Sequence, residues 1–242
     1  MVSKNQIKLI TGLQQKKFRQ SQELFFAEGI KVIGELLQSD FELEHLYETA
    51  SLFPQVMAAK KTTISESELK KISVLSTPNN CLALFKIPKQ KPIVDAGLIV
   101  VLDDIRDPGN LGTIMRLCDW FGVEQLVCSP KTVDIYNPKV IQATMGSISR
   151  VAIHYTELKP FLANSKLSIF GTFMDGNNIY AEKLPASGII IMGNEANGIS
   201  EAVENLAKNR IAIPRFGKLK QTESLNVATA TAIILSEFRR NA

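Results

Sequence analysis

The chain has 242 residues, of which 45% are hydrophobic and 21% are charged, an ordinary globular composition that argues against a disordered or fibrous protein. No apolar run is long enough to cross a bilayer, and the polar residues 1–6 lack the apolar core of a signal peptide, so we expect a soluble cytoplasmic protein. The net charge of +4 is by itself weak evidence for a nucleic-acid partner.

The cysteines and histidines are too few and too scattered to suggest a metal site. Cys81, Cys118 and Cys128 lack metal-type spacing, and we interpret them as reduced, mostly buried thiols. His45 and His154 are the only histidines, and neither has a cluster of possible ligands around it. We therefore expect neither a bound metal nor a catalytic histidine.

The first part of the chain mixes helical and extended patterns. The predicted elements are helices over residues 7–22 and 30–38 and strands over residues 25–29 and 43–47. Ser65 followed by Glu68 is a capping-box pattern that predicts a further helix start. These elements indicate a small α/β domain over residues 1–90.

A connecting segment follows this domain. Residues 86–97 contain two prolines and three lysines, a composition typical of a linker. We assign residues 91–97 to the linker and residues 98–242 to a second domain.

The second domain has a regular pattern of short apolar runs. The predicted strands are residues 98–102, 125–128, 151–154, 167–172, 188–192 and 211–213, and a helix is predicted over residues 225–239. Helical stretches separate most of these runs, which predicts a mostly parallel sheet with helices on both faces. Parallel sheets bind ligands at the carboxyl ends of their strands, and three unusual segments occur at such ends.

The first segment, residues 102–116, leaves the first predicted strand and enters a helix. Asn110 is well placed to cap that helix, which would be a purely structural role. Arg116 carries a permanent charge on a planar fork of donors suited to phosphate. The structural alternative for Arg116 is an ion pair with Asp103, Asp104 or Asp119.

The second segment, residues 189–200, is a strand that runs into a turn containing Gly193 and Gly198. It lacks the Lys-Ser/Thr of a phosphate-binding P-loop and the glycine fingerprint of dinucleotide folds. Glu195 places a carboxylate at the end of the strand. Its structural alternative is a first-turn acid that interacts with the following helix N-terminus.

The third segment begins at Ile213-Pro214 and reaches the final helix through Ser224-Leu225-Asn226. Between Glu204 and Glu223 the chain has five basic residues and no acidic one; they are Lys208, Arg210, Arg215, Lys218 and Lys220. This cluster is either a solvated face or a phosphate-contacting surface of the kind that binds RNA. Ser224 alone would be interpreted as a helix cap.

Taken in order, the three segments resemble the motifs of the SpoU (TrmH-like) family of RNA 2′-O-ribose methyltransferases. Residues 107–116 match Asp-Pro-x-Asn-x-Gly-x-x-x-Arg, residues 193–200 match Gly-x-Glu-x-x-Gly-x-Ser, and residues 213–227 contain Ile-Pro and Ser-Leu-Asn-Val. The N-terminal segment with Phe25, Glu28 and Gly29 is similar, more loosely, to the L30e-like substrate-binding domain of many members.

The resemblance implies a C-terminal trefoil knot that binds S-adenosylmethionine, and a homodimer with sites near the subunit interface. It assigns the cofactor pocket to eight residues: Thr172, Phe173, Met192, Gly193, Asn194, Gly198, Ile213 and Leu225. It places five residues around the reacting ribose: Asn110, Arg116, Glu195, Ser224 and Asn226. RNA contacts are expected from Lys17, Arg19, Glu28, Arg215, Lys218 and Lys220.

These residue types suit methyl transfer to a ribose hydroxyl. The sulfonium cofactor supplies an electrophilic methyl group, so the protein has to bind, align and deprotonate the acceptor. Because the arginine pKa lies far above neutrality, we favour Arg116 as the group that grips the acceptor phosphate and stabilises the developing alkoxide. The identity of the base stays open at this point.

The sequence leaves several alternatives. The segment between Pro214 and Ser224 is about three residues longer than the common family version. This longer segment is a candidate for selecting the RNA substrate. An rRNA or tRNA substrate, and a housekeeping or resistance role, are equally compatible with the motifs. From other classes, an inactive RNA-binding module of the same fold conflicts with the intact polar residues, and a nicotinamide-dependent oxidoreductase lacks its glycine fingerprint.

Overall fold

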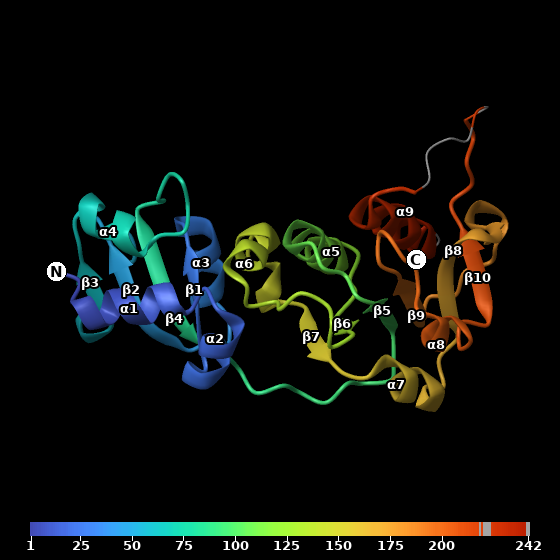
Figure 1. The fold of residues 1–242 in the computed structure, drawn as a ribbon, viewed down its shortest axis with the longest axis horizontal. Helices are drawn as coiled ribbons and strands as arrows, with labels where there is room; N and C mark the ends of the chain where they lie inside the picture. The colour runs from blue at the N-terminus through green and yellow to red at the C-terminus, as the bar shows by residue number, and fades with distance from the viewer. Residues whose placement is uncertain (218, 220–223, 241–242) are drawn as a thin grey trace. The chain divides into compact units, whose positions relative to one another are not determined.

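The computed structural model describes residues 1–217, 219 and 224–240. The chain divides into two compact units (Figure 1). The first contains residues 1–89 together with 134–149, and the second contains residues 90–133 and the described residues from Arg150 onward. The predicted end of the first domain at residue 90 and start of the second at residue 98 concern parts of the chain that fold independently, and they remain predictions.

The first unit is a mixed sheet with helices around it. Its elements are α1 (Lys4–Gly12), α2 (Lys16–Gln22), β1 (Leu24–Glu28), α3 (Ile30–Leu37), β2 (Leu43–Glu48), η1 (Ala58–Lys60), β3 (Lys61–Thr63), α4 (Glu66–Ile72), β4 (Cys81–Lys86), α6 (Pro138–Thr144) and η2 (Ser147–Ser149). The strand order is β1-β4-β2-β3. β4 pairs antiparallel with β1 and β2, and β3 pairs parallel with β2.

The helix predicted over residues 7–22 is two helices. The break lies at Leu13, whose side chain turns into the core and is fully buried. The carbonyls of Leu13 and Gln14, which helical bonding would otherwise satisfy, accept hydrogen bonds from Arg19 Nη1 at 2.7 and 2.9 Å. The capping box predicted at Ser65 and Glu68 is confirmed at the start of α4.

Residues 134–149 join this unit through a buried ion pair. Arg19 is 2% exposed, and its Nε donates to Asp134 Oδ2 at 3.0 Å. Phe25 packs on Tyr136 with ring centroids 4.9 Å apart. Because a charged group is buried only with a partner, Arg19 has a structural role here, and this corrects its expected role as an RNA contact.

Glu28 is also an interior residue and not a surface contact. Its side chain is 3% exposed and accepts hydrogen bonds from Ser73 Oγ and from the Val74 backbone N–H. Burial raises the pKa of Glu28, and these two hydrogen bonds oppose that shift. The carboxylate therefore connects β1 to the segment after α4, and this corrects the expected role of Glu28 as an RNA contact.

The second unit is a parallel sheet with helices on both faces. Its elements are β5 (Leu98–Leu102), α5 (Pro108–Trp120), β6 (Gln125–Cys128), β7 (Ala152–Tyr155), α7 (Leu158–Asn164), β8 (Ile169–Asn178), η3 (Ile179–Ala181), β9 (Gly188–Met192), α8 (Glu201–Glu204), β10 (Asn209–Ala212) and α9 (Val227–Arg239). The order is β10-β8-β9-β5-β6-β7, and every pair is parallel. The predicted parallel α/β sheet is therefore confirmed.

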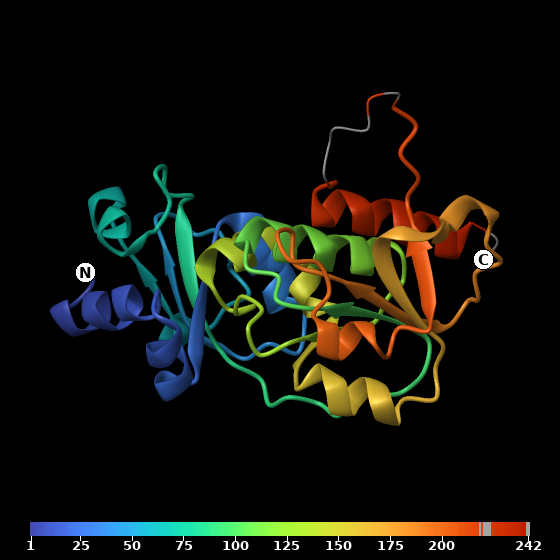
Figure 2. The same cartoon turned by 45° about the vertical axis from the view of Figure 1, so that its right-hand side comes forward.

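The two helical layers use alternate side chains of the central strands. Ile99 and Ile189 point to one face, where they pack in one cluster with Leu158 of α7 and Val203 of α8. On the other face α5 lies beside α9 (Figure 2). This arrangement leaves the carboxyl ends of β5, β8, β9 and β10 at one edge of the sheet.

The cysteines are confirmed as buried free thiols. Burial raises the pKa of Cys81 to about 11 and also raises those of Cys118 and Cys128, which disfavours the reactive thiolate. Among the described residues, no helix has the length and apolarity needed to cross a membrane, and no group of three or more acidic, histidine or cysteine side chains is arranged to hold a metal.

His154, inside β7, should make the stability of the protein depend on pH. It is 1% exposed, and neither ring nitrogen makes a hydrogen bond of normal length to a described residue. Burial lowers the pKa of His154, and the nearby Lys91 backbone offsets only part of this. The unfolded chain therefore protonates His154 more readily than the folded chain does. The contribution of neutral His154 to the unfolding free energy is fully present above about pH 6.5, and it is lost as the pH falls through the folded pKa.

Chemical denaturation between pH 5 and 7.5 checks this expectation. The unfolding free energy should fall on acidification, and the fall should be smaller in His154→Phe. Equal pH dependence in the two proteins would show that His154 titrates alike in the folded and unfolded states.

Candidate active site

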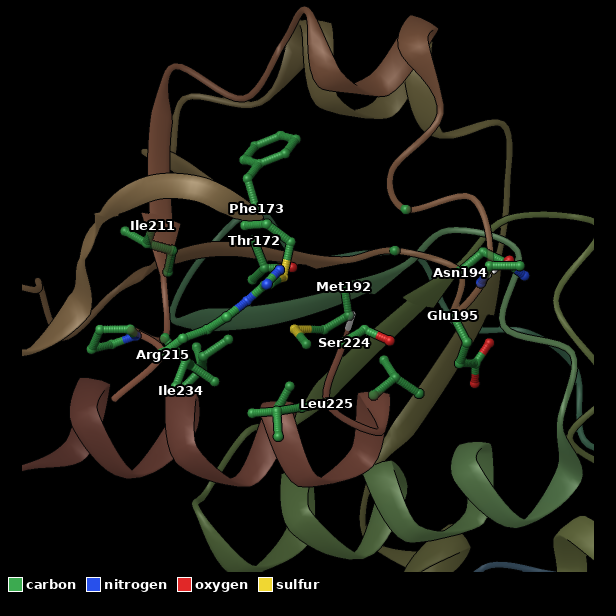
Figure 3. Close-up of a pocket in the computed structure, with 18 of the residues that line it drawn as sticks. Thr172, Phe173, Met192, Asn194, Glu195, Ile211, Arg215, Ser224, Leu225 and Ile234 are labelled. Carbon is green, nitrogen blue, oxygen red and sulfur yellow. Dashed lines mark hydrogen bonds between the residues drawn. The ribbon is translucent and has the colours of Figure 1, made fainter. Parts of the chain in front are cut away.

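A cavity of about 1100 Å³ opens where β8 and the loops after β9 and β10 meet α9 (Figure 3). This volume is slightly above the usual range for small-molecule sites, about 300–1,000 Å³. Apolar side chains from β9, β10 and α9, including Met192, Ile211 and Ile234, form much of its wall. The cavity lies at the carboxyl edge of the parallel sheet, where ligands are expected to bind.

All eight residues predicted to form a cofactor pocket line this cavity. They are Thr172 and Phe173 from β8, Met192 from β9, Gly193, Asn194 and Gly198 from the following turn, and Ile213 and Leu225 from the segment between β10 and α9. Glu195 and Ser224, predicted to lie beside the acceptor, line it as well. The structure thus brings together residues that are up to 53 positions apart, from Thr172 to Leu225.

Sequence reasoning missed several lining residues. Ile211, Ala230 and Ile234 are ordinary apolar positions of a strand and a helix, so only their tertiary placement identifies them. Phe216 carried a usable signal, because an aromatic residue in a basic polar loop has no local structural purpose.

The conformation of the turn after β9 explains why positions 193 and 198 are glycines. Asn194 and Gly198 form an antiparallel bridge, and Gly198 has φ +68°, a conformation that glycine adopts most readily. A Cβ on Gly193 would lie 2.3 Å from the Gly198 carbonyl carbon and 2.4 Å from the Ile199 nitrogen. The turn therefore closes so tightly that backbone forms this wall of the cavity.

Replacing Gly193 by alanine should consequently be destabilising. The new methyl group forces the turn apart, and such overpacking typically costs about 1–3 kcal/mol. Urea denaturation measures the loss. Gly217→Ala is the matched control, because a Cβ there meets nothing within 4 Å, and it should change the unfolding free energy by less than about 0.5 kcal/mol. Equal effects would mean that the turn relaxes freely.

Two hydrogen bonds attach this turn to the loop after β5. Asn194 Nδ2 donates to the Asp104 carbonyl at 2.7 Å, and the Ser200 N–H donates to Asp103 Oδ2 at 2.8 Å. Asp103 is 6% exposed, so its carboxylate is held by this contact. The first and second segments are thereby fixed to each other.

The predicted acceptor-site residues Asn110, Glu195 and Asn226 form a chain of hydrogen bonds. Asn110 Nδ2 donates to Glu195 Oε1 at 2.6 Å, and Asn226 Nδ2 donates to Asn110 Oδ1 at 2.9 Å. Asn226 Oδ1 accepts from the Ala228 and Thr229 N–H groups at the start of α9. Each amide oxygen accepts and each amide nitrogen donates, so the orientation of the whole chain is set by the helix at one end and the carboxylate at the other.

This geometry corrects three structural alternatives from the sequence. Asp107, and not Asn110, caps α5 by accepting from the Asn110 N–H at 2.7 Å. Asn226, and not Ser224, caps α9. Glu195 lies in the turn before α8, which begins at Glu201, so it is no first-turn acid. Asn110 and Glu195 are therefore free to point their side chains toward each other.

Arg116 differs from these residues because it does not line the cavity. It is an exposed side chain of α5, and it makes no hydrogen bond or ion pair with any residue that the structure describes. The suggested partners are used elsewhere: Asp104 binds Arg106, Asp119 binds Arg150, and Asp103 accepts from the Ser200 N–H. An ion pair with one of these three acids is therefore not the role of Arg116.

The expected RNA-contact residues have different environments. Lys17 is exposed on α2. Arg215 lines the cavity, and its side chain extends into it toward Thr172 (Figure 3). Arg210, which was only part of the basic cluster, lies 3.6 Å above the Phe173 ring and pairs with Asp175 and Glu204. Lys218 and Lys220 lie outside the described residues.

Two family models match the chain. Residues 97–236 match the model of the SpoU rRNA Methylase family, and residues 4–83 match the model of an MRM3-like substrate binding domain. The first match includes every residue of the hydrogen-bonded chain and all the lining residues of the cavity.

Full-length relatives agree. The chain is 28% identical to the 23S rRNA (guanosine(2553)-2′-O)-methyltransferase RlmP of Bacillus subtilis, over 98% of this chain and 97% of the relative. A TrmH-family structure from Porphyromonas gingivalis is 36% identical with a TM-score of 0.92 and full coverage of both chains. An AdoMet-bound rRNA methyltransferase from Sinorhizobium meliloti is 26% identical with a TM-score of 0.88, covering 99% of this chain and 97% of that one. The chain belongs to the SpoU rRNA methylase family.

Proposed function

We propose that this chain transfers a methyl group from S-adenosylmethionine to a ribose 2′-hydroxyl of rRNA or tRNA. The observation that carries the proposal is the cavity at the carboxyl edge of the sheet, with the Glu195–Asn110–Asn226 chain attached to it. The B. subtilis relative is a 2′-O-methyltransferase of 23S rRNA, and the S. meliloti relative binds AdoMet.

The cavity fits the cofactor. Backbone around Gly193 and Gly198 provides a wall without side chains, while Leu225, Ile213 and Ile234 provide apolar surface for a planar base. Asn194 is already held by Asp104 and by the Ala196 and Asn197 N–H groups. When bound here, S-adenosylmethionine supplies an electrophilic methyl group on a sulfonium centre.

The remaining work of the chain is to orient and stabilise the acceptor. Glu195, fixed by Asn110, presents a carboxylate at the cavity, and Ser224 offers a hydroxyl beside it. Arg116 binds the acceptor phosphate and stabilises negative charge that develops on the ribose oxygen. Neither histidine lies at the cavity, so acid–base catalysis by histidine has no part in this mechanism.

The first unit is the proposed substrate-binding domain, with an L30e-like fold. Its match to an MRM3-like substrate binding domain supports this role. Lys8, Lys16 and Lys17 are exposed basic residues of α1 and the start of α2. Such residues contribute affinity through phosphate contacts that do not depend on sequence.

Three further features follow from family membership. We propose, from membership of the family, that the C-terminal part of the chain forms a trefoil knot, that two chains form a homodimer, and that the protein acts in the cytoplasm. Trp120, the only tryptophan, is 84% exposed at the end of α5, and an aromatic residue so exposed suits a subunit interface.

The decisive experiment supplies S-adenosylmethionine labelled in its methyl group together with unmodified rRNA and tRNA in separate reactions. Nucleoside mass spectrometry should find a 2′-O-methylated nucleoside in one of them. Transfer to a base would overturn the ribose assignment. RNA binding without transfer to either substrate would favour the inactive RNA-binding module.

A further inference from the structure

Two exposed aromatic rings stand at the rim of the cavity. Phe216 is 82% exposed and Tyr180 is 38% exposed, and their ring centroids lie 6.5 Å apart with an interplanar angle of 27°. Phe216 lines the cavity, so the pair adjoins the site where the methyl donor binds. Large apolar side chains exposed together commonly mark an interaction surface.

Tyr180 is the fixed member of the pair. It lies in η3, where Asn178 Oδ1 accepts from its backbone N–H at 3.1 Å. Its neighbour Ile179 is fully buried, and η3 contacts α9. Phe216 comes from the segment after β10, so the rings belong to different parts of the chain and meet only in the folded unit.

The spacing of the rings suits a third planar group. Aromatic pairs in contact have centroids about 4.5–7 Å apart, so this pair is near the open end of that range. Stacked bases are separated by about 3.4 Å, and a base between two rings needs about twice that distance. The distance of 6.5 Å between the ring centroids is close to this requirement, and the two ring planes are inclined by 27°.

The charges beside the pair suit a nucleotide and not a purely apolar partner. Arg215 directly precedes Phe216, and the exposed Lys183 follows Tyr180 by three residues. The half-buried Glu182 is the acidic residue next to them, while Asp175 is paired with Arg210. Exposed aromatic faces flanked by cations are how proteins hold unpaired bases through stacking and phosphate contacts.

We propose that Tyr180 and Phe216 form a clamp that stacks on an unpaired base of the RNA substrate next to the methylated nucleotide. This inference rests on the proposed function, because it requires RNA to approach the cavity. The clamp would select single-stranded or loop RNA by its accessible base faces, and it would position the acceptor ribose without contacting the reacting atoms.

Substitutions at Phe216 in the full-length protein test the clamp. Phe216→Ala and Phe216→Leu should each weaken RNA binding and raise the KM for RNA by about 5- to 150-fold, the range for loss of one base–aromatic stack. Phe216→Tyr should restore binding, because it retains the ring, whereas leucine retains only apolar bulk. Tyr180→Leu should act in the same direction, and Val94→Ala is the matched control because Val94 is 59% exposed in the same unit.

The salt dependence of RNA binding separates stacking from charge. Phe216→Leu should leave the slope of log K against log salt unchanged, whereas Arg215→Ala should reduce it if Arg215 contacts a phosphate. The affinity for S-adenosylhomocysteine, measured by calorimetry without RNA, should change less than twofold in Tyr180→Leu, because Tyr180 does not line the cavity.

Three results would overturn the clamp. A loss of S-adenosylhomocysteine affinity in Phe216→Leu would assign the ring to the cofactor. Dissociation of the protein into smaller species in sedimentation would assign the surface to a second copy of the chain. RNA affinity equal to wild type would remove the base contact. Failure of the proposed function is distinguishable, since the wild-type protein itself would then transfer no methyl group to RNA.

Discussion

Replacing Arg116 by alanine is expected to lower the kcat of methyl transfer by about 100-fold or more, while the affinity for S-adenosylhomocysteine changes less than twofold. Arg116 is exposed, does not line the cavity and has no partner among the described residues, so none of those residues neutralises its charge. Loss of one oriented group that stabilises transition-state charge typically costs about 10²–10³ in kcat. Single-turnover methylation of RNA measures the effect.

Two variants sharpen this test. Arg116→Lys retains the charge but loses the planar fork, so it should remain at least about tenfold below wild type. Arg106→Ala removes another exposed arginine from the same motif, one that pairs with Asp104 at 2.8 Å, and it should remain close to wild type. Near-full methylation by Arg116→Ala with unchanged RNA affinity would show that the central role assigned to Arg116 is wrong.

The second large effect is expected from Asn226→Asp. This nearly isosteric change keeps an oxygen acceptor for the Ala228 and Thr229 N–H groups, and a carboxylate is favourable at a helix N-terminus. It removes the N–H donor to Asn110 Oδ1. The Asn110 amide then lies between two carboxylates. Its Nδ2 can donate a hydrogen bond to one of them only while its Oδ1 faces the other, which is a repulsive contact.

Activity and stability should therefore separate in Asn226→Asp. We expect kcat to fall about 100-fold because Glu195 loses its orientation, while thermal stability stays equal to wild type or rises. Asn226→Ala should lose both activity and stability, with about 1 kcal/mol from the missing cap. If Asn226→Asp methylates RNA at the wild-type rate, the hydrogen-bonded chain serves only the fold.

Elements of the fold that depend on local sequence patterns were predicted, and features that depend on contacts between distant residues were not. Strands 98–102, 125–128 and 188–192 were predicted with the bounds that the structure has, because buried strands are largely apolar runs. The break at Leu13 was not predicted, since its compensating donor, Arg19, is held in place by Asp134. That ion pair joins residues 115 positions apart, and no local pattern indicates it.

The same contrast between local patterns and long-range contacts applies to the site. The motifs indicated which loops carry polar residues and glycines, but they suggested Asn110 as a cap because asparagine before a helical run commonly has that role. Asp107, three residues earlier, caps the helix instead. The Asn110 side chain is therefore available to donate a hydrogen bond to Glu195. Here Asp107 is the cap, and the Asn110 side chain makes hydrogen bonds with Glu195 and Asn226.

The sequence by itself determined the parallel α/β class, the three motif-bearing loops and, through their resemblance to a family, the reaction. Apolar periodicity, turn residues and motif spacing are local properties, so they can be read along the chain. Only the tertiary structure decided that Arg19 and Glu28 are interior residues, that Asn226, Asn110 and Glu195 form one directed chain, and that Tyr180 faces Phe216. These are contacts between residues far apart in sequence, and they depend on how the strands and helices are packed.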